Sequence, residues 1–191
     1  MIVKTRKAPY DHCPNVKMIT VEGLKTAQSI NVMETLKNID EVPLIIEIGT
    51  CRGGFTLLLR HFFPNAEIHT WDIAEWEPKE LKSSLFKEHD INYHLEDCFT
   101  SNELLNLVRD DRKKIVFCDG GHKASEFNRF SKEINYGDII GVHDYFESRD
   151  DYDPELWTAC EVDFNDLNME GKFNQVYKHS MQSVWGLFKR I

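Results

Sequence analysis

The sequence contains few cysteines, and their spacing excludes the cysteine-based classes of small protein. There are 5 in 191 residues, an odd number, and no two of them form a Cys-x-x-Cys pair. This pattern argues against both a disulfide framework and a zinc knuckle. We interpret the five as reduced, mostly buried thiols: Cys13, Cys51, Cys98, Cys118 and Cys160.

Long apolar runs and positive charge are also scarce. No stretch approaches the roughly 20 apolar residues that span a bilayer, and residues 1–7 lack the apolar core of a signal peptide. We therefore expect a cytoplasmic protein without a membrane partner. The 23 Lys and Arg are outnumbered by 32 Asp and Glu, which gives a net charge of -9 and disfavours nucleic acid as a partner. The sequence carries no signal for an oligomeric state.

The chain otherwise has the composition of a globular protein, with 41% hydrophobic and 29% charged residues. Its length of 191 residues predicts one domain, 1–191. We divide that domain into an N-terminal arm and helix (1–41), a central core (42–144), and a loop, helix and closing hairpin (145–191). In the first part, apolar residues recur at helical spacing, which predicts a helix over 20–39 after an irregular arm.

Predicted strands and helices alternate through the core. Strands are predicted at residues 44–49, 67–73, 91–95, 114–118 and 139–142, and helices at 55–63, 78–88, 101–109 and 124–134. This alternation predicts an α/β fold with a doubly wound, Rossmann-like sheet of mostly parallel strands. Two more β-rich runs, 173–178 and 183–189, are too close together for a helical crossover, and we expect them to form an antiparallel hairpin.

An acidic residue stands at the carboxyl end of every predicted core strand. In an open α/β sheet, ligands bind at that edge. Any one of these acids could instead be a helix cap or a turn former. Five in succession favour a binding site, and they are Glu47, Asp72, Asp97, Asp119 and Asp144.

The turn after the first core strand contains Gly49 and Gly53 and leads into a predicted helix. Its glycines admit a ligand close to the backbone, and the positive end of the helix dipole faces the same place. Position 51 is not glycine, so the turn departs from the G-x-G-x-x-G dinucleotide motif. Glu47 would repel a pyrophosphate but would suit a ligand with ammonium and sulfonium groups. Asp72 is placed to accept hydrogen bonds from a ribose diol.

At these residues the sequence resembles the class I S-adenosylmethionine-dependent methyltransferases. The resemblance covers about residues 42–144, and the last two strands fit the reversed hairpin that closes the seven-stranded sheet of that family. It implies S-adenosylmethionine as the cofactor, bound by the glycine motif, by the ribose and adenine contact and by an acidic segment at 96–98. The implied cofactor-binding residues are Glu47, Gly49, Thr50, Gly53, Asp72, Ile73, Asp97, Cys98 and Asp119.

A second resemblance is to metal-dependent O-methyltransferases, a group that includes macrocin and rhamnosyl O-methyltransferases and cephalosporin-hydroxylase-like proteins. It rests on Asp119-Gly-Gly-His122 and on the pair His143-Asp144, where the family often has Glu first. The resemblance implies that Asp119, His143 and Asp144 are metal ligands and that His122 is the catalytic base. Two carboxylates suit Mg²⁺ or Mn²⁺, and an imidazole shifts the preference toward Mn, Fe or Zn.

Two of these roles have structural alternatives. Neighbours on a regular strand point to opposite faces, so His143 and Asp144 can share an ion only if the strand bends there; otherwise one of them is structural. His122 could be a surface histidine at a helix start rather than a base. Trp71, Trp76 and the pair at 145–146 could stack on a ligand or belong to the core.

The combined prediction is an enzyme that transfers the methyl group of S-adenosylmethionine to a hydroxyl of a small-molecule acceptor with the help of a divalent metal. Two alternatives from other classes remain. One is an NAD-dependent oxidoreductase, against which the missing middle glycine argues. The other is a non-catalytic module that binds the cofactor without turnover.

Overall fold

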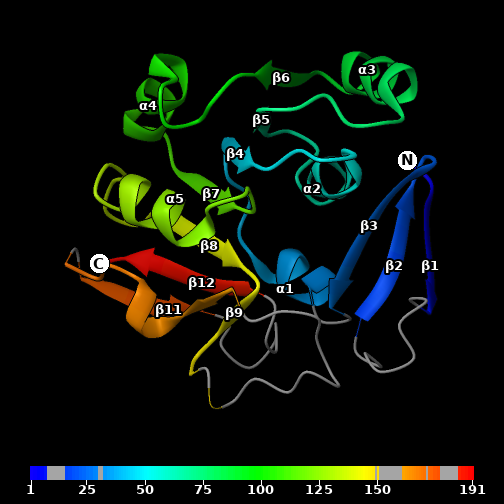
Figure 1. The fold of residues 1–191 in the computed structure, drawn as a ribbon. Helices are drawn as coiled ribbons and strands as arrows, with labels where there is room; N and C mark the ends of the chain where they lie inside the picture. The colour runs from blue at the N-terminus through cyan, green and yellow to red at the C-terminus, as the bar shows by residue number, and fades with distance from the viewer. Residues whose placement is uncertain (8–15, 30–31, 149, 151–160, 171, 177–184) are drawn as a thin grey trace.

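The computed structural model describes residues 1–7, 16–29, 32–148, 150, 161–170, 172–176 and 185–191 (Figure 1). Its main feature is a seven-stranded sheet in the order β11-β12-β8-β7-β4-β5-β6. The strands are β4 (Leu44–Ile48), β5 (Glu67–Asp72), β6 (Ile91–Leu95), β7 (Lys114–Cys118), β8 (Ile139–His143), β11 (Phe173–Val176) and β12 (Trp185–Arg190). β4 to β8 run parallel, whereas β12 is antiparallel to both β8 and β11. The predicted fold class and closing hairpin are confirmed, although residues 177–184 lie outside the described part.

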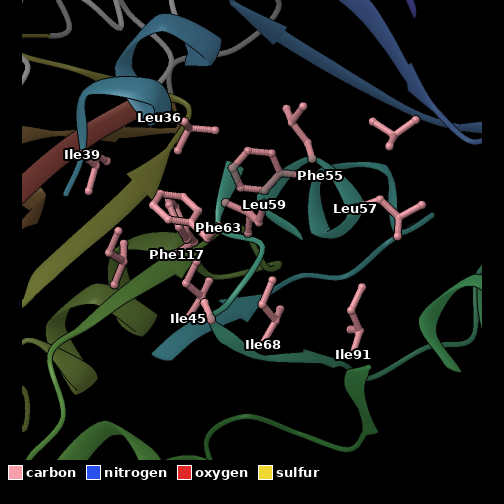
Figure 2. Packing of buried hydrophobic residues seen from close by; sticks show 14 of the residues in the cluster. Leu36, Ile39, Ile45, Phe55, Leu57, Leu59, Phe63, Ile68, Ile91 and Phe117 are labelled. Atoms are coloured by element: carbon pink, nitrogen blue, oxygen red, sulfur yellow. The ribbon is translucent and has the colours of Figure 1, made fainter. Parts of the chain in front are cut away.

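Helices cover both faces of this sheet, as the continuous apolar sequence of β4 predicts. On one face, α2 (Gly54–Phe62) and α3 (Lys79–Glu88) contribute to one hydrophobic cluster. On the other face, α4 (Asn102–Arg109) and α5 (Lys123–Phe130) contribute to a second cluster. Figure 2 shows Phe55 and Leu59 of α2 packing over Ile45 and Ile68 of the sheet. Side chains alternate between the faces along a strand, which places Glu47 on the α2 face together with Ile45.

The N-terminal part differs from its prediction. It forms an antiparallel sheet of β1 (Val3–Lys7), β2 (Val16–Val21) and β3 (Leu24–Ser29), followed by a short helix, α1 (Val32–Asn38). The helix predicted over 20–39 is therefore wrong for residues 20–29. Residues 8–15 of the expected irregular arm lie outside the described part, and the beginning of that arm is strand β1.

A two-residue turn explains the error. Glu22 and Gly23 both have positive φ, 49° and 97°, a combination typical of tight hairpin turns. The turn pairs Val21 with Leu24 across the hairpin, and their spacing of three residues imitates a helical repeat. Both side chains are buried in the cluster that also contains the apolar residues of α2.

The part after β8 contains a two-stranded parallel sheet of β9 (Tyr145–Phe146) and β10 (Val162–Asp163), followed by a single 3-10 turn at Phe164–Asp166. The helix expected between loop and hairpin is not among the described residues, which omit 151–160. Tyr145 and Phe146 are buried, so the core interpretation holds for them. No helix in the described part has the length and apolar character needed to cross a bilayer.

Candidate functional site

A cavity of about 260 Å³ lies at the carboxyl edge of the sheet, at the ends of β4, β5, β6 and β7. Its volume is close to the lower end of small-molecule sites, about 300 Å³. Six of the predicted site residues line it: Gly49, Asp72, Ile73, Asp97, Cys98 and His122. The sheet edge at which the row of acids predicted a binding site therefore contains a cavity.

The glycine turn brings the β4 and β7 loops into contact. Gly49 has a φ of 99°, and a Cβ atom there would lie 2.2 Å from the backbone oxygen of Asp119. Backbone hydrogen bonds fix this approach: the amides of Gly49 and Thr50 donate to the carbonyl of Trp71 at 2.8 and 3.1 Å, and the Asp119 amide donates to the Ile48 carbonyl at 2.8 Å. Only glycine fits position 49 without moving the backbone that forms the cavity wall.

Asp72 extends from the end of β5 beside this turn. Its Oδ2 accepts a hydrogen bond of 2.7 Å from the Cys51 amide, and its Oδ1 accepts one of 3.0 Å from the Ala74 amide. Trp76 Nε1 lies 3.4 Å from the same Oδ1. A carboxylate has about four acceptor positions, so one remains for a ribose hydroxyl, and a second becomes available if a ligand displaces the 3.4 Å contact of Trp76.

Glu47 differs from its expected role because it does not line the cavity. The side chain is completely buried, and its Oε2 accepts hydrogen bonds from Thr56 at 2.5 Å and Thr70 at 2.6 Å. Burial raises the pKa of Glu47 to about 8, so the carboxyl group is mostly protonated at neutral pH. It stabilises the contact of β4 and β5 with α2 instead of presenting a charge to a ligand.

Thr50 and Gly53 also lie outside the cavity lining. The buried Thr50 hydroxyl is 2.6 Å from that of Thr70, which links it to Glu47. Gly53 precedes α2 with a φ of 78°, and its amide donates to the Thr50 carbonyl at 2.8 Å. Both residues therefore help to form the turn without lining the cavity.

Several lining residues had no role in the prediction: Ile48, Phe99, Gly120, Gly121 and Glu126. Glu126 is the most informative. Its buried carboxylate accepts hydrogen bonds from the amides of Gly120 and His122, both at 3.1 Å, and so fixes the loop after β7. Burial raises the pKa of Glu126, and the two backbone hydrogen bonds oppose that shift. The sequence feature that could have indicated this role is the position of Glu126, four residues after His122 and in the first turn of α5.

Trp71 and Glu96 act together on the adjacent wall. Trp71 Nε1 donates to Glu96 Oε1 at 3.1 Å, and the same oxygen accepts a hydrogen bond of 2.6 Å from Ser101. Ser101 also caps α4, since its hydroxyl accepts from the Leu104 amide. Asp97 beside them accepts a hydrogen bond from the Phe99 amide at 2.9 Å. The predicted acidic segment at 96–98 is thus built into the cavity through its backbone turn and through α4.

The three predicted metal ligands lie together. Asp119, His143 and Asp144 each place one ligand atom within 4.8 Å of the other two. His143 Nδ1 lies 2.9 Å from Asp119 Oδ1 and 3.3 Å from Asp144 Oδ2. Asp144 has a φ of 53°, so the chain leaves the strand conformation after His143 and both side chains can face Asp119. The bend required for a shared site is present.

Positive charge already balances this cluster. Burial alone lowers the pKa of His143, but the carboxylates of Asp119 and Asp144 outweigh it and raise the pKa to about 10. Lys123 Nζ lies 3.3 Å from Asp144 Oδ2 and 2.7 Å from Glu161 Oε2. A divalent ion at the three ligands would displace the proton of His143 and compete with the Lys123 ammonium.

His122 precedes α5 at the cavity wall, and its side chain is exposed. It is adjacent in sequence to Lys123 and three residues from Asp119. The loop that carries His122 therefore joins the cavity to the carboxylate cluster. An exposed imidazole at such a place can exchange protons with a bound ligand and with water.

Neither a protein-family model nor a curated protein matches the sequence. Solved structures do match. Human N-acetylserotonin methyltransferase in complex with SAM has a TM-score of 0.55 at 16% identity, over 84% of this chain and 50% of that one. The fibrillarin/Nop5p complex has a TM-score of 0.55 at 14% identity, over 98% and 93%. An O-methyltransferase family protein from Burkholderia thailandensis has a TM-score of 0.54 at 9% identity, over 83% and 54%.

The chain has the Rossmann-like methyltransferase fold. At these identities the similarity shows the fold alone. The chain spans about half the length of the human and Burkholderia methyltransferases, but nearly all of the matched fibrillarin-complex chain.

Proposed function

We propose that the protein is an S-adenosylmethionine-dependent methyltransferase that methylates a hydroxyl of a small molecule with the help of a divalent metal ion. The observation that supports this most is the cavity at the carboxyl edge, whose wall comes from the ends of four successive parallel strands. The methyltransferase fold supports the same reaction class.

Within this proposal the cavity holds the nucleoside part of the cofactor. Asp72 accepts hydrogen bonds from the ribose hydroxyls, and Ile73 and Cys98 contact the adenine ring. Gly49 lets the backbone approach the ligand, and Asp97 lies where it can accept a hydrogen bond from the adenine amine. All five residues line the cavity.

The residues at Asp119, His143 and Asp144 fit a divalent metal ion, because two carboxylates and one imidazole converge within 4.8 Å. Such a donor set suits Mn²⁺ and related ions, with Mg²⁺ favoured if His143 stays protonated. When bound, the ion would lower the pKa of an acceptor hydroxyl.

The chain itself aligns the acceptor and removes a proton. Methyl transfer needs the acceptor oxygen in line with the sulfonium methyl group, so positioning is the main task of the protein. His122 takes the hydroxyl proton in this scheme, an effect of order 10²–10⁴ in rate. Glu126 accepts a hydrogen bond from the His122 amide, and this fixes the backbone from which the imidazole extends at the cavity wall.

Titration calorimetry and thermal shift with S-adenosylmethionine, S-adenosylhomocysteine and NADH test the cofactor. We expect the first two to bind, and a ligand at 100 times its dissociation constant to stabilise the fold by about 2.7 kcal/mol. Binding of NADH instead would favour an oxidoreductase and overturn the proposal.

Turnover with a panel of hydroxylated acceptors tests the reaction. We expect activity that rises with Mn²⁺ or Mg²⁺, falls with EDTA, and is lost in Asp144→Asn while cofactor affinity is kept. His122→Ala should lose about 10²-fold or more in rate. Unchanged activity in His122→Ala would remove the base, and cofactor binding without turnover on any acceptor would favour a binding module.

A further inference from the structure

A second cluster of metal-ligating side chains lies outside the proposed active site, where β5, β6 and α4 meet. One ring nitrogen of His69, one of His94 and one carboxylate oxygen of Glu103 all lie within 4.8 Å of one another. His69 Nδ1 and His94 Nε2 are 3.0 Å apart, and the two rings are nearly parallel, 12° between planes. His94 Nδ1 lies 3.6 Å from Glu103 Oε2.

The tautomer of His69 is set by its other neighbour. Its Nε2 lies 2.6 Å from Glu67 Oε1, and Glu67 Oε2 in turn accepts a hydrogen bond of 2.6 Å from Arg112. In the neutral ring, a carboxylate at this distance favours the proton on Nε2, and the lone pair on Nδ1 then faces His94. Carboxylate–imidazole–metal arrangements of this kind are the usual surroundings of a metal-ligating histidine.

We propose that His69, His94 and Glu103 form a binding site for a transition-metal ion such as Zn²⁺, separate from the cluster at Asp119. Two imidazoles select Zn²⁺, Co²⁺ or Ni²⁺ over Mg²⁺ and Ca²⁺, which prefer oxygen. Zinc–nitrogen bonds of about 2.0–2.1 Å put adjacent ligands about 3.3 Å apart, so the imidazoles need to separate by a few tenths of an ångström. The Glu103 carboxylate, which lies beside Nδ1 of His94, needs to move toward the Nε2 atom that faces His69.

The site is accessible and yet anchored. His69 is 6% exposed and fixed on β5, whereas the Glu103 side chain is 58% exposed and can adjust its rotamer. An ion here would join the edge strand β6 to β5 and α4. It would also lie next to Trp71, whose ring stacks on His94 with centroids 4.1 Å apart and which lines the cavity.

Calorimetric titration with Zn²⁺ at neutral pH, on the full chain carrying Asp144→Asn to weaken the other cluster, tests the proposal. We expect one ion to bind. His94→Gln should weaken its binding by more than about 10-fold, the lower bound seen even for second-shell changes at metal sites. Co²⁺ in place of Zn²⁺ should show the visible absorption of a nitrogen-coordinated ion, which His94→Gln should remove.

Glu103→Gln separates ligation from folding, because the side chain is exposed and the change is nearly isosteric. It should also weaken Zn²⁺ binding. Its control is Glu80→Gln, an exposed glutamate in the first turn of α3, which should leave Zn²⁺ binding unchanged. Failure of the Asp144→Asn chain to bind Zn²⁺, or equal affinity with and without His94→Gln, would overturn the site and would not bear on methyl transfer.

Discussion

The two edges of the main sheet use buried charge in opposite ways. At the amino edge, Lys114 and Asp138 form an ion pair with an Nζ–Oδ2 distance of 2.7 Å, and the two side chains are 0% and 2% exposed. Lys114 Nζ also donates to the Asp110 carbonyl at 2.7 Å, and Asp138 accepts hydrogen bonds from the amides of Lys114 and Asn135. Both charges of this pair therefore have fixed partners.

At the carboxyl edge the charged groups are paired but remain partly exposed: the Asp119 and Asp144 side chains are 21% and 13% exposed. Asp119 and Asp144 both face His143, and the nearby Glu47 keeps a buried oxygen, Oε1, without a hydrogen-bond partner among the described residues. Cys51 and Asp144 have positive φ, 46° and 53°, which costs non-glycine residues energy. The amino edge thus encloses its ion pair completely, whereas the carboxyl edge leaves two carboxylates partly exposed beside a cavity.

The largest expected effect comes from removing the buried ion pair at the amino edge. Asp138→Ala leaves the Lys114 ammonium buried without its carboxylate, so we expect a loss of about 3–5 kcal/mol in unfolding free energy by urea denaturation. Cofactor affinity at the other edge should stay unchanged under conditions where the variant is folded. The double variant Lys114→Met with Asp138→Asn should recover part of the loss, because it removes both charges and keeps an amide oxygen as an acceptor for the backbone amides. A loss below about 1 kcal/mol for Asp138→Ala, roughly that of an exposed pair, would contradict the comparison.

Two glycines of the same cavity wall provide a test of the loop contact at the carboxyl edge. Gly49→Ala forces a Cβ against the Asp119 backbone at positive φ, so it should weaken cofactor binding by about 100-fold or more. Gly121→Ala is the matched control, since no atom of the described residues other than its chain neighbours lies within 4 Å of the added Cβ, and its unfolding free energy should match wild type. Calorimetry and urea denaturation measure both; equal behaviour of the two variants would count against the loop contact.

The protonated state of Glu47 gives the carboxyl edge a pH dependence. Its pKa is raised from 4.5 to about 8 by burial, so the folded protein binds this proton more tightly than the unfolded chain. Its contribution to stability is therefore complete below about pH 4.5 and is lost as the pH rises through 8, with a slope of at most about 1.4 kcal/mol per pH unit. Glu47→Gln should flatten the wild-type decline in unfolding free energy; parallel pH curves for the two proteins would show that Glu47 ionises freely.

The smallest effect concerns the cap that joins α4 to the cavity wall. Ser101→Ala removes the acceptor for the Leu104 amide and the donor to Glu96, and we expect a loss of about 1 kcal/mol. Ser101→Asp should restore the cap but not the donor to Glu96. Thermal unfolding of the three proteins separates the two contributions; equal losses in both variants would show that the Glu96 contact carries the effect.

The core of the fold follows from the sequence because its signals agree. The strands β4 and β7 are short apolar runs, and each strand from β4 to β7 is followed by a turn and a helix. The periodicity, the length of each segment and the turn residues between segments therefore predict the same elements. The N-terminal sheet could not be found in this way. Val21 and Leu24 fit a helical period equally well, and only the turn at Glu22 and Gly23, which needs positive φ, separates the two interpretations.

The site was predictable where a residue's place along a strand determines its position. Asp72 ends β5, Asp97 follows β6, and both line the cavity, whereas Asp119 and Asp144 meet at the neighbouring cluster. Glu47 was misjudged because it lies inside β4, one residue before the strand end, and alternation turns it toward α2. Glu126 could not be assigned because its contacts are to backbone amides of a loop whose course the sequence does not specify.

A crystal structure of the chain with S-adenosylhomocysteine tests the central claim most directly. We expect the ligand to occupy the cavity at the carboxyl edge, with its ribose hydroxyls on Asp72 and its adenine between Ile73 and Cys98. A ligand bound at the amino edge or elsewhere on the surface, with the cavity filled by the protein's own side chains, would contradict it.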